Sequence, residues 1–557
     1  MNLRRLINFS LFSLSCFVIA GGSLYLLLKE RNSRELMQKT IDQLKIEQSE
    51  FMKQANLSPV VEKLVAKSEV WRPVQEQVQD TVVQVFAQIA ELDMLQPYKT
   101  PSQYSVTGSA FFINERGDLV TNAHVVGQAK SVWIQIPSLG KKILDVDVLG
   151  IAPERDLALL KLRPDGLELV KSALGEVPFL SLGDSDQVRR ADEVLALGYP
   201  LGQQALKSTT GIISGREFHM LQMSAPINPG SSGGPLLNVN GEVVGINNSG
   251  VVEAQNVGFA VPVNDLKIVL NDLYNVRILH RPFLGILYNN ATESLVEFLE
   301  NPKPGGCYVT EVVKNSTLDE AGIKPGDMIY SINGYDVDLY GEMKVPWSED
   351  KISIMDYVMR LAIGDEVCLD LYRNGEKNQV VTALNQVKLP AIRKVYPAYE
   401  DIDYEVFGGL VVMELTVNHL AMLGQKAPGL ARYAEMQNQA EPTLIITHIF
   451  RTSEIFRVDT MREGSTINEV NGEPVKTLAD FRQAVKKSLD LNYVTLRVSD
   501  NIGRISDNIF VALPFNKVLA EEPRLAREYH YPLSELSKQL IASAQISQSC
   551  AAKAVAA

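Results

Sequence analysis

Hydrophobic residues between positions 81 and 250 fall into short segments rich in Val and Ile, with turn residues between them. The clearest segments are TVVQVFAQI at 81–89, KSVWIQI at 130–136, DVDVLGI at 145–151 and EVVGINN at 242–248. Short strands at such spacing predict an all-β barrel or sandwich. The pattern changes at 263–275, where VNDLKIVLNDLYN has the apolar spacing of an amphipathic helix that leads into a new domain.

The N-terminus combines a basic start with a long uncharged run. After MNLRR, no charged residue occurs from Leu6 to Leu28. A helix of 23 residues, at about 1.5 Å each, just spans a hydrocarbon core of about 30 Å. We therefore expect a cytoplasmic N-terminus at 1–5 and a transmembrane signal anchor at 6–28. A signal peptide cleaved after Ala20, which leaves a secreted protein, is the alternative.

Residues 29–72 are charged, contain no glycine and predict a helix. Ile41, Leu44 and Phe51 lie near a heptad seam, but Gln48 interrupts it. A coiled coil needs three or four heptads, and this seam covers one or two. We interpret the segment as a helical spacer, with an oligomerisation stalk as the alternative.

Composition narrows the classes of function. A chain of 557 residues is long enough for three or four domains, and 46% hydrophobic with 22% charged residues is typical of globular proteins. The net charge of −12, without a basic stripe, argues against nucleic acid as a partner. No metal-ligand spacing and no phosphate-binding loop occurs, so we expect no metal and no cofactor. Of the four cysteines, Cys307 and Cys368 are expected as free thiols rather than a pair.

Three motifs carry candidate chemistry. Ser232 stands among glycines in NPGSSGGPL at 228–236, His124 in TNAHVV at 121–126, and Asp156 in ERDLALLKL at 154–162. Acyl transfer by serine needs a base for the hydroxyl proton and a carboxylate that fixes the tautomer of that base. The order His, Asp, Ser along the chain matches chymotrypsin-type double barrels and not the subtilisin or α/β-hydrolase orders. Taken singly, each residue also fits a structural role in a turn or half-buried site.

The motifs resemble those of the HtrA/Deg family of ATP-independent serine proteases. The resemblance covers the protease region, about 75–265, and rests on TNAHVV, DLALLKL, ALGYPLG (196–202), TTGIISG (209–215) and GSSGGPLLNVNGEVVGIN (230–247). It implies a mainly β chain, with a trypsin-like double β-barrel protease domain at 73–265 followed by PDZ modules. It further implies that His124 is the general base, Asp156 its orienting carboxylate and Ser232 the nucleophile. The backbone N–H groups of Gly230 and Ser232 would form the oxyanion hole.

Substrate contacts are predicted from the residues around the nucleophile. SAPIN at 224–228 contains no acid that would attract Lys or Arg, and Ile227 would line an apolar pocket for small or medium aliphatic side chains. A place for Ile227 in the barrel core is the alternative. The strand at Ile246, Asn247 and Asn248 is expected to pair with the substrate backbone.

Two later segments repeat one pattern. KPGDMIYSING at 324–334 and REGSTINEVNG at 462–472 share Gly-x-x-Ile-x-x-[Ile/Val]-Asn-Gly, which in the HtrA family belongs to PDZ domains. We expect α+β PDZ-like modules at 280–390 and, more divergent, at 403–515. In the first, Phe283, Leu284, Gly285 and Ile286 resemble the loop that binds C-terminal peptides. FGGL at 407–410 is the candidate loop of the second. A C-terminal extension and disordered tail are predicted at 516–557.

The family resemblance implies an endopeptidase for misfolded or regulatory proteins in extracytoplasmic quality control. The partners would be unfolded or extended protein substrates, C-terminal peptides at the PDZ module, the membrane through the anchor, and further copies of the chain in a trimer or larger homo-oligomer. Its location would be the inner membrane, with the protease in the periplasm. One departure is the short loop at 215–220, which in relatives is often longer. A catalytically latent chaperone or PDZ scaffold is the alternative function.

Overall fold

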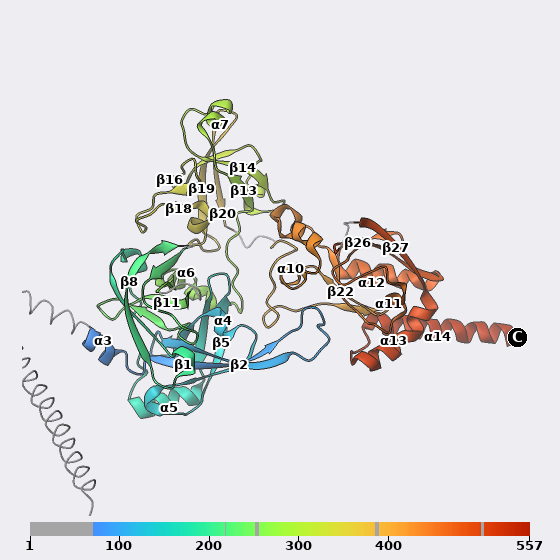
Figure 1. Ribbon diagram of the computed structural model, residues 1–557, viewed down its shortest axis with the longest axis horizontal. Coiled ribbons are helices and arrows are strands. Elements are labelled where there is room, and N and C mark those ends of the chain that lie inside the picture. The colour runs from blue at the N-terminus through green and yellow to red at the C-terminus, as the bar shows by residue number, and fades with distance from the viewer. Residues whose placement is uncertain (1–70, 218, 251–255, 385–388, 503–505, 557) are drawn as a thin grey trace, which may run out of the picture. The chain divides into compact units, whose positions relative to one another are not determined.

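The computed structural model describes residues 71–556 apart from 218, 251–255, 385–388 and 503–505 (Figure 1). The predicted anchor at 6–28 and the predicted spacer up to residue 70 lie outside this part of the chain. The first described element is helix α3 (Trp71–Gln77). Among the described helices, none combines the length and the apolar character needed to cross a membrane.

The first barrel is a closed sheet of six antiparallel strands in the order β1-β2-β3-β6-β5-β4. Val83, Val85 and Ala87 of β1 belong to its buried core at every second position, as the alternation of side chains in a strand requires. The elements are β1 (Val82–Glu91), β2 (Ser102–Phe112), β3 (Asp118–Thr121), α4 (Ala123–Val126), β4 (Ala129–Gln135), β5 (Leu144–Ala152), β6 (Leu157–Leu162) and α5 (Pro164–Leu174).

The second barrel is also closed, in the order β10-β11-β12-β9-β8-β7. The elements are β7 (Glu193–Gly198), β8 (Lys207–Glu217), β9 (Met220–Met223), β10 (Pro235–Leu237), β11 (Val243–Gly250), β12 (Gly258–Pro262) and the predicted amphipathic helix α6 (Val263–Leu273). Two closed six-stranded barrels confirm the predicted chymotrypsin-like architecture.

The next domain is built on a sheet in the order β13-β14-β15-β19-β20, with β16 paired to β15. Its strands are β13 (Ile286–Asn289), β14 (Cys307–Val312), β15 (Met328–Ile332), β16 (Tyr335–Asp336), β19 (Glu366–Arg373) and β20 (Glu376–Ala383), with the hairpin β17 (Glu342–Met343) and β18 (Ile352–Ser353) inserted. Its helices are α7 (Glu293–Phe298), α8 (Thr317–Glu320) and α9 (Ile354–Val358). Cys307 and Cys368 are free thiols, as predicted, and burial raises the pKa of Cys307 to about 12.

The last domain contains a sheet in the order β21-β22-β23-β24-β26-β27, with β25 paired to β24. Its strands are β21 (Glu405–Phe407), β22 (Leu410–Glu414), β23 (Leu444–Ile449), β24 (Thr466–Val470), β25 (Glu473–Pro474), β26 (Tyr493–Asp500) and β27 (Ser506–Pro514). Its helices are α10 (Val417–Leu423), α11 (Glu454–Val458), α12 (Leu478–Lys486), α13 (Phe515–Tyr529) and α14 (Glu535–Ala556).

The repeated sequence pattern forms the same hairpin in both domains. After β15, Asn333 and Gly334 have φ of 48° and 82°, and Ile332 pairs with Tyr335. After β24, Asn471 and Gly472 have φ of 53° and 79°, and the chain returns as β25. An Asn-Gly pair with two positive φ angles is the preferred two-residue hairpin turn. The predicted duplication is therefore present in the backbone as well as in the sequence.

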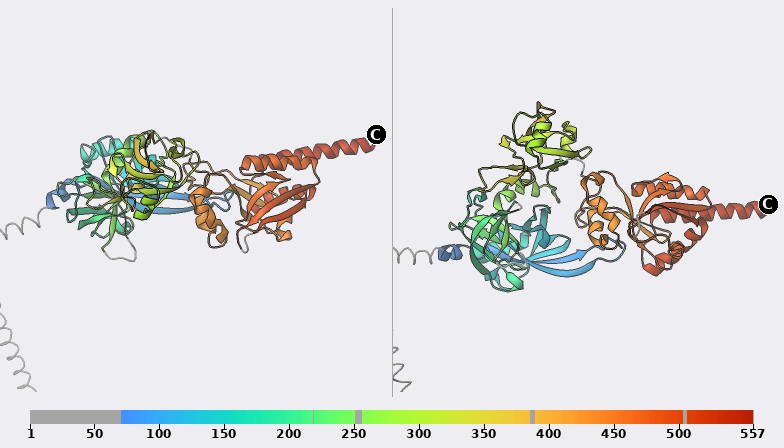
Figure 2. Two further views of the ribbon diagram at one scale, coloured as in Figure 1. Left: turned by 90° about the horizontal axis from the view of Figure 1, so that it is seen from above. Right: turned by 45° about the horizontal axis from the view of Figure 1, so that its top comes forward.

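The chain is helical through most of the predicted C-terminal extension and disordered tail at 516–557, which corrects the prediction of disorder at its end. It forms α13 and α14, and α14 leaves the domain as a single long helix (Figure 2). Val518 and Leu519 of α13 and Leu536 and Leu540 of α14 are buried in the core of the last domain. Leu536 and Leu540 are four residues apart, so they lie on one helix face. The tail prediction overlooked this apolar face, and the domain extends past the predicted end at 515.

Candidate active site

His124 is held on a one-turn helix at the end of β3. Asn122 is the N-terminal cap residue of α4, but its side chain does not cap the helix. The Asn122 amide instead donates a hydrogen bond of 3.0 Å to the backbone carbonyl of Asp156. This bond ties the turn that carries Asp156 to the helix that carries His124.

Asp156 lies in the turn between β5 and β6 with a φ of 55°, a left-handed conformation that Asp tolerates better than most residues. Its Oδ1 accepts a 2.9 Å hydrogen bond from the backbone N–H of His124, and its Oδ2 lies 2.7 Å from His124 Nδ1. Because a carboxylate only accepts hydrogen bonds, Nδ1 must carry the proton. The Nε2 lone pair of His124 is then available as a base, on a side chain that is 49% exposed.

Ser232 lies in the second barrel, in the loop before β10. Its hydroxyl donates a 2.6 Å hydrogen bond to the backbone carbonyl of Asn248 on β11. A hydroxyl has a single proton, so in this arrangement Ser232 does not donate to His124. The nucleophile candidate is thus held against the neighbouring strand.

The loop before Ser232 is held by a backbone contact to the segment after β7. The Pro229 carbonyl accepts a 2.6 Å hydrogen bond from Leu201 N–H. The peptide bond to Gly230 is trans, so the Gly230 N–H points the opposite way. Gly230 has a φ of 97°, and a Cβ there would lie 2.5 Å from the Tyr199 carbonyl. Only glycine fits this position without displacement of the backbone.

Ser109 is a site residue that the sequence analysis missed. It lies on β2 of the first barrel, fully buried, and its N–H donates to the Ser232 carbonyl at 2.8 Å. Its hydroxyl donates to the Gly230 carbonyl at 2.8 Å and accepts from Tyr199 N–H at 2.9 Å. The sequence showed it only as the first residue of an apolar strand, and nothing local indicates a partner 121 residues away.

Ser109→Ala is expected to lower kcat about 10- to 100-fold with little change in KM, because the loop that carries Ser232 loses a buried hydrogen bond. The free energy of unfolding of the protease domain should fall by about 1–3 kcal/mol, since the Gly230 carbonyl and Tyr199 N–H each lose a partner. Steady-state kinetics on a peptide substrate and chemical denaturation measure both effects. Ser172→Ala, on the exposed side of α5, is the control. An unchanged kcat would contradict the positioning role of Ser109.

The strand predicted to bind substrate is only partly available. Ile246 is paired on both sides, with Pro235 of β10 and Val261 of β12. The backbone of Asn247 is bonded to Gly233 and Gly234, and its side chain donates to the carbonyls of Leu197 and Pro235. Of the three predicted residues, Asn248 is therefore the one brought to Ser232.

Ile227 lies among the buried residues of the second barrel, 9% exposed. Its Cγ1 would be 2.9 Å from a Cβ at Gly258, so its side chain closely approaches the backbone of β12. This is the core position named above as the alternative.

The predicted peptide loop of the first PDZ domain precedes β13. Leu284 and Ile286 are buried in the domain core, and Phe283 is half-buried beside the turn. The Gly285 carbonyl accepts from Val313 N–H at 2.8 Å, and Gly285 has a φ of 79°. The structure thus brings the four predicted residues together in one turn at the start of a strand.

The predicted short loop at 215–220 is a hairpin in which Glu217 pairs directly with Met220.

Arg155, next to Asp156 in the chain, contacts the first PDZ domain. The Arg155 guanidinium donates to the carbonyls of Leu361, at 2.8 Å, and Met359. Burial lowers the pKa of Arg155, which the nearby carboxylate of Asp265 opposes.

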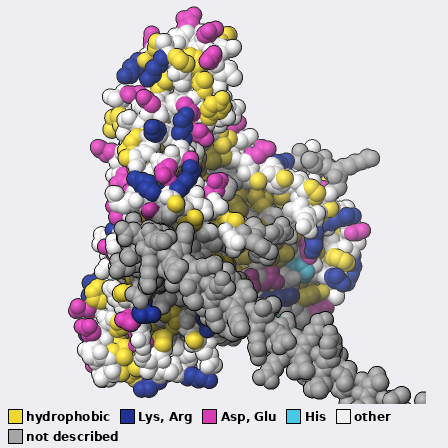
Figure 3. Space-filling model, turned by 60° about the vertical axis from the view of Figure 1, so that its left-hand side comes forward, with side chains coloured by type: hydrophobic (Ala, Val, Ile, Leu, Met, Phe, Trp, Pro, Cys, Tyr) yellow, Lys and Arg dark blue, Asp and Glu magenta, His cyan; other side chains and the backbone are white. Residues whose placement is uncertain are grey.

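No group of three or more His, Cys, Asp or Glu side chains suited to a metal ion occurs among the described residues. On the face drawn in Figure 3, Lys and Arg side chains lie among Asp and Glu side chains and form no continuous basic stripe.

Comparisons with known proteins agree with this geometry. Residues 108–246 match the trypsin-like peptidase domain family, and residues 282–384 and 395–538 each match a PDZ domain family. A DegP-like periplasmic serine endoprotease of Hahella chejuensis is 29% identical over 416 residues, which are 70% of this chain and 78% of that protein. A protein of the same description from Chlamydia trachomatis is 31% identical over 318 residues, 54% of this chain and 59% of that protein. The solved structure of the HtrA-type protease AlgW with a decapeptide has 25% identity and a TM-score of 0.45, and covers 57% of this chain and 99% of that one.

The two barrels, the site and these matches define a trypsin-like serine peptidase with two PDZ domains. Within that class, the chain is an HtrA/DegP-like serine endoprotease, as the resemblance of its motifs predicted.

Proposed function

We propose that Ser232, His124 and Asp156 are the nucleophile, general base and orienting carboxylate of this endoprotease. The observation that carries the proposal is the pair of hydrogen bonds that the Asp156 carboxylate accepts from the backbone N–H and from Nδ1 of His124. It leaves Nε2 as the basic atom, in the tautomer that can accept the Ser232 proton.

The reaction would proceed as an acyl transfer. His124 takes the hydroxyl proton while Ser232 Oγ attacks the scissile carbonyl, and the Gly230 and Ser232 N–H groups stabilise the oxyanion. The imidazolium then gives its proton to the leaving amine, and water repeats the sequence on the acyl-enzyme. A substrate strand whose N–H binds the Asn248 carbonyl would displace the Ser232 hydroxyl from that carbonyl. Substrate pairing thereby frees the nucleophile for His124.

The substrates we propose are unfolded or extended proteins, because a chain must be extended to pair with the strand at Asn248. Full-length protein should cleave reduced, unfolded casein and leave a stable folded protein of similar size intact, as followed by gel electrophoresis. Equal cleavage of both proteins would contradict the preference for unfolded or extended substrates. It would not affect the assignment of Ser232, His124 and Asp156.

The first PDZ domain is proposed to bind C-terminal peptides through the N–H groups around Leu284, Gly285 and Ile286. β13 is the end strand of its sheet among the described strands, so a peptide can add to its outer edge.

Phe283→Glu places a negative charge beside the proposed carboxylate site without a change in the backbone. We expect the Kd for a hydrophobic C-terminal peptide to rise at least about 10-fold, as a like charge repels the peptide carboxylate. Fluorescence anisotropy with a labelled peptide measures this change. The same peptide with an amidated C-terminus is the control, since it should bind wild type and variant equally weakly. An unchanged Kd for the free-acid peptide would place the binding site elsewhere.

We further propose a periplasmic location, as the descriptions of the relatives indicate, with residues 6–28 as a single-pass inner-membrane anchor and a homo-oligomer as the working unit. Extraction of membranes at alkaline pH separates an integral protein from a secreted one. Recovery in the soluble fraction of a chain that lacks the residues up to Ala20 would favour cleavage there.

A further inference from the structure

The two PDZ domains contain the same turn at the start of their peptide-binding strands. Gly285 and Gly409 have φ of 79° and 84°, and a Cβ on either would lie within 2.2 Å of the Cβ of a serine, Ser316 or Ser453. The carbonyls of the two glycines accept matching 2.8 Å bonds from Val313 and Phe450. The segment 408–410 is therefore the structural counterpart of the carboxylate-binding segment 284–286.

The strands that follow these turns differ in what lies beside them. β13 is bonded to β14 on one side and, among the described strands, ends its sheet. β22 is bonded to β23 on one side and to β21 on the other, with Phe407 opposite Leu410 and Glu405 opposite Val412. A bound peptide adds to the outer edge of this strand by main-chain hydrogen bonds. In the second PDZ domain that edge is already taken by the chain itself.

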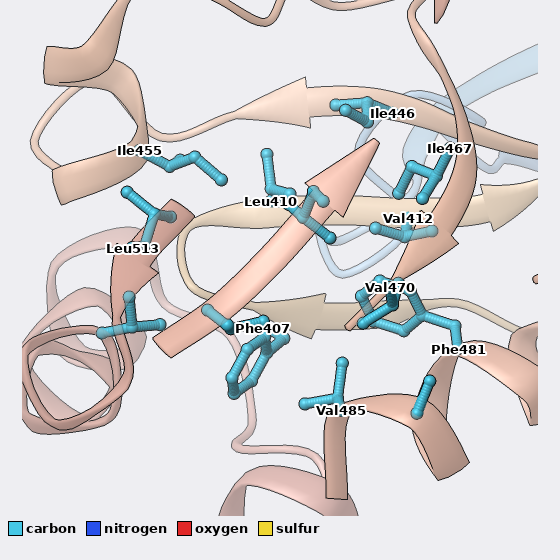
Figure 4. Packing of buried hydrophobic residues seen from close by; sticks show 14 of the residues in the cluster. Phe407, Leu410, Val412, Ile446, Ile455, Ile467, Val470, Phe481, Val485 and Leu513 are labelled. Atoms are coloured by element: carbon cyan, nitrogen blue, oxygen red, sulfur yellow. The ribbon is translucent and has the colours of Figure 1, made fainter. Parts of the chain in front are cut away.

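β21 also fills the hydrophobic side of the groove. Phe407 is 3% exposed and belongs to one buried cluster with Phe481 and Val485 of α12, the helix that faces the strand (Figure 4). Its ring centroid lies 6.5 Å from that of Phe515. The Phe407 side chain thus occupies the apolar space where a side chain of a bound peptide would be buried.

Polar contacts hold the same strand against α12. Arg482 donates to Glu405 at 2.7 Å and to both carboxylate oxygens of Asp403 at 2.7 and 2.8 Å. Bidentate pairs between Arg and a carboxylate are among the stronger and more directional hydrogen bonds in proteins. The segment 403–407 is therefore held by the apolar packing of Phe407 and by the hydrogen bonds of Arg482 to Asp403 and Glu405.

A carboxyl group contacts the turn itself. Glu522 of α13 is fully buried, and its Oε1 accepts a hydrogen bond from the N–H of Gly408. Its other oxygen is approached by Ser537 Oγ at 3.3 Å and Tyr531 OH at 3.5 Å. Gly408 corresponds to Leu284, whose N–H belongs to the proposed carboxylate site of the first PDZ domain. Glu522 thus presents to this turn the chemical group that a peptide C-terminus would present.

We propose that the second PDZ domain carries an internal ligand, with β21 in the position of the peptide strand and Glu522 in the position of the peptide carboxylate. Recognition of C-terminal peptides is then confined to the first PDZ domain. The second domain is closed to such peptides in the form described here, and α13 is part of its ligand rather than an appendage.

Hydrogen exchange on the full-length chain in detergent, with a saturating hydrophobic C-terminal peptide, tests the proposal. The amides of 408–412 should be protected before the peptide is added and unchanged after it. Calorimetry should give one peptide per chain, and in Phe283→Glu the Kd of this single site should rise at least about 10-fold. Peptide-dependent protection at 408–412, or a second site whose Kd is the same in wild type and Phe283→Glu, would overturn the internal ligand. The exchange at 408–412 is independent of whether the first PDZ domain binds.

Glu522→Leu removes the acceptor while it keeps a side chain of similar size. We expect the Gly408 amide to exchange at least about 10-fold faster in this variant. Glu528→Leu, on the exposed end of α13, is the matched control and should leave Gly408 unchanged. Equal exchange in both variants would contradict the role of Glu522, and the wild-type peptide experiment stands even where Glu522→Leu fails to fold.

The pH dependence of the same amide adds a second readout. Burial raises the pKa of Glu522 from its usual 4.5 to about 7, with Gly408 N–H and Ser537 acting against it and Glu405 and Glu521 reinforcing it. Opening the turn then releases a proton, so closure is most stable below pH 4.5 and weakens as pH rises through about 7. Protection of Gly408, corrected for intrinsic exchange, should fall by up to about 10-fold per pH unit in this window. Glu522→Leu should remove the slope, and a slope retained in that variant would assign it to another group.

Discussion

Ser232→Ala should abolish proteolysis, with kcat reduced by about 10⁶-fold and the fold unchanged. In the proposed mechanism this hydroxyl forms the acyl-enzyme, with His124 as its base. Its loss removes one hydrogen bond, to the Asn248 carbonyl, at a position that is partly buried. Initial rates of casein cleavage by purified wild type and variant measure the effect.

The control for this result is Ser172→Ala, which removes a hydroxyl bonded within α5 and exposed to solvent. It should keep the full wild-type rate. Cleavage by Ser232→Ala above about one part in 10⁴ of the wild-type rate, from a preparation free of other proteases, would show that another nucleophile acts.

Asp156→Asn should lower kcat by about 10⁴-fold while KM changes little. The wild-type carboxylate accepts from two donors, the backbone N–H and Nδ1–H of His124. An amide offers one acceptor oxygen and one donor NH₂. If the oxygen keeps the backbone bond, the NH₂ faces Nδ1, and the imidazole must move its proton to Nε2. His124 in that tautomer cannot accept the Ser232 proton.

Asp147→Asn is a matched control on β5, because its carboxylate forms an exposed ion pair with Arg163 at 2.8 Å. Exposed pairs of this kind contribute about 0–1 kcal/mol to stability, so activity and unfolding should hardly change. A full-rate Asp156→Asn enzyme would mean that Asp156 does not set the tautomer of His124.

The sequence predicted those parts of the site that local motifs encode. Short apolar or glycine-rich motifs contain each of the three residues His124, Asp156 and Ser232. Their order along the chain matches chymotrypsin-type double barrels and not the subtilisin or α/β-hydrolase orders. Strand spacing predicted a barrel or sandwich, and the resemblance to the HtrA/Deg family specified two barrels. The repeated pattern that ends in Asn-Gly predicted the two PDZ-like modules.

Features that depend on contacts between distant segments were not predictable in this way. Ser109 acts through two loops of the other barrel, at sequence separations of 90 and 121 residues. The pairing of β11 on both sides decides that Asn248, rather than Ile246 or Asn247, reaches Ser232. The closure of the second PDZ domain likewise depends on Glu522, more than 100 residues after Gly408.

The most direct test of the central claim is labelling of the full-length protein with a serine-directed fluorophosphonate, followed by peptide mapping. The account predicts one modified residue, Ser232, in the wild type. In His124→Ala the label should be lost or greatly slowed, because no base remains to take the hydroxyl proton. A label on a different serine, or labelling of Ser232 at the wild-type rate in His124→Ala, would contradict the proposed catalytic site.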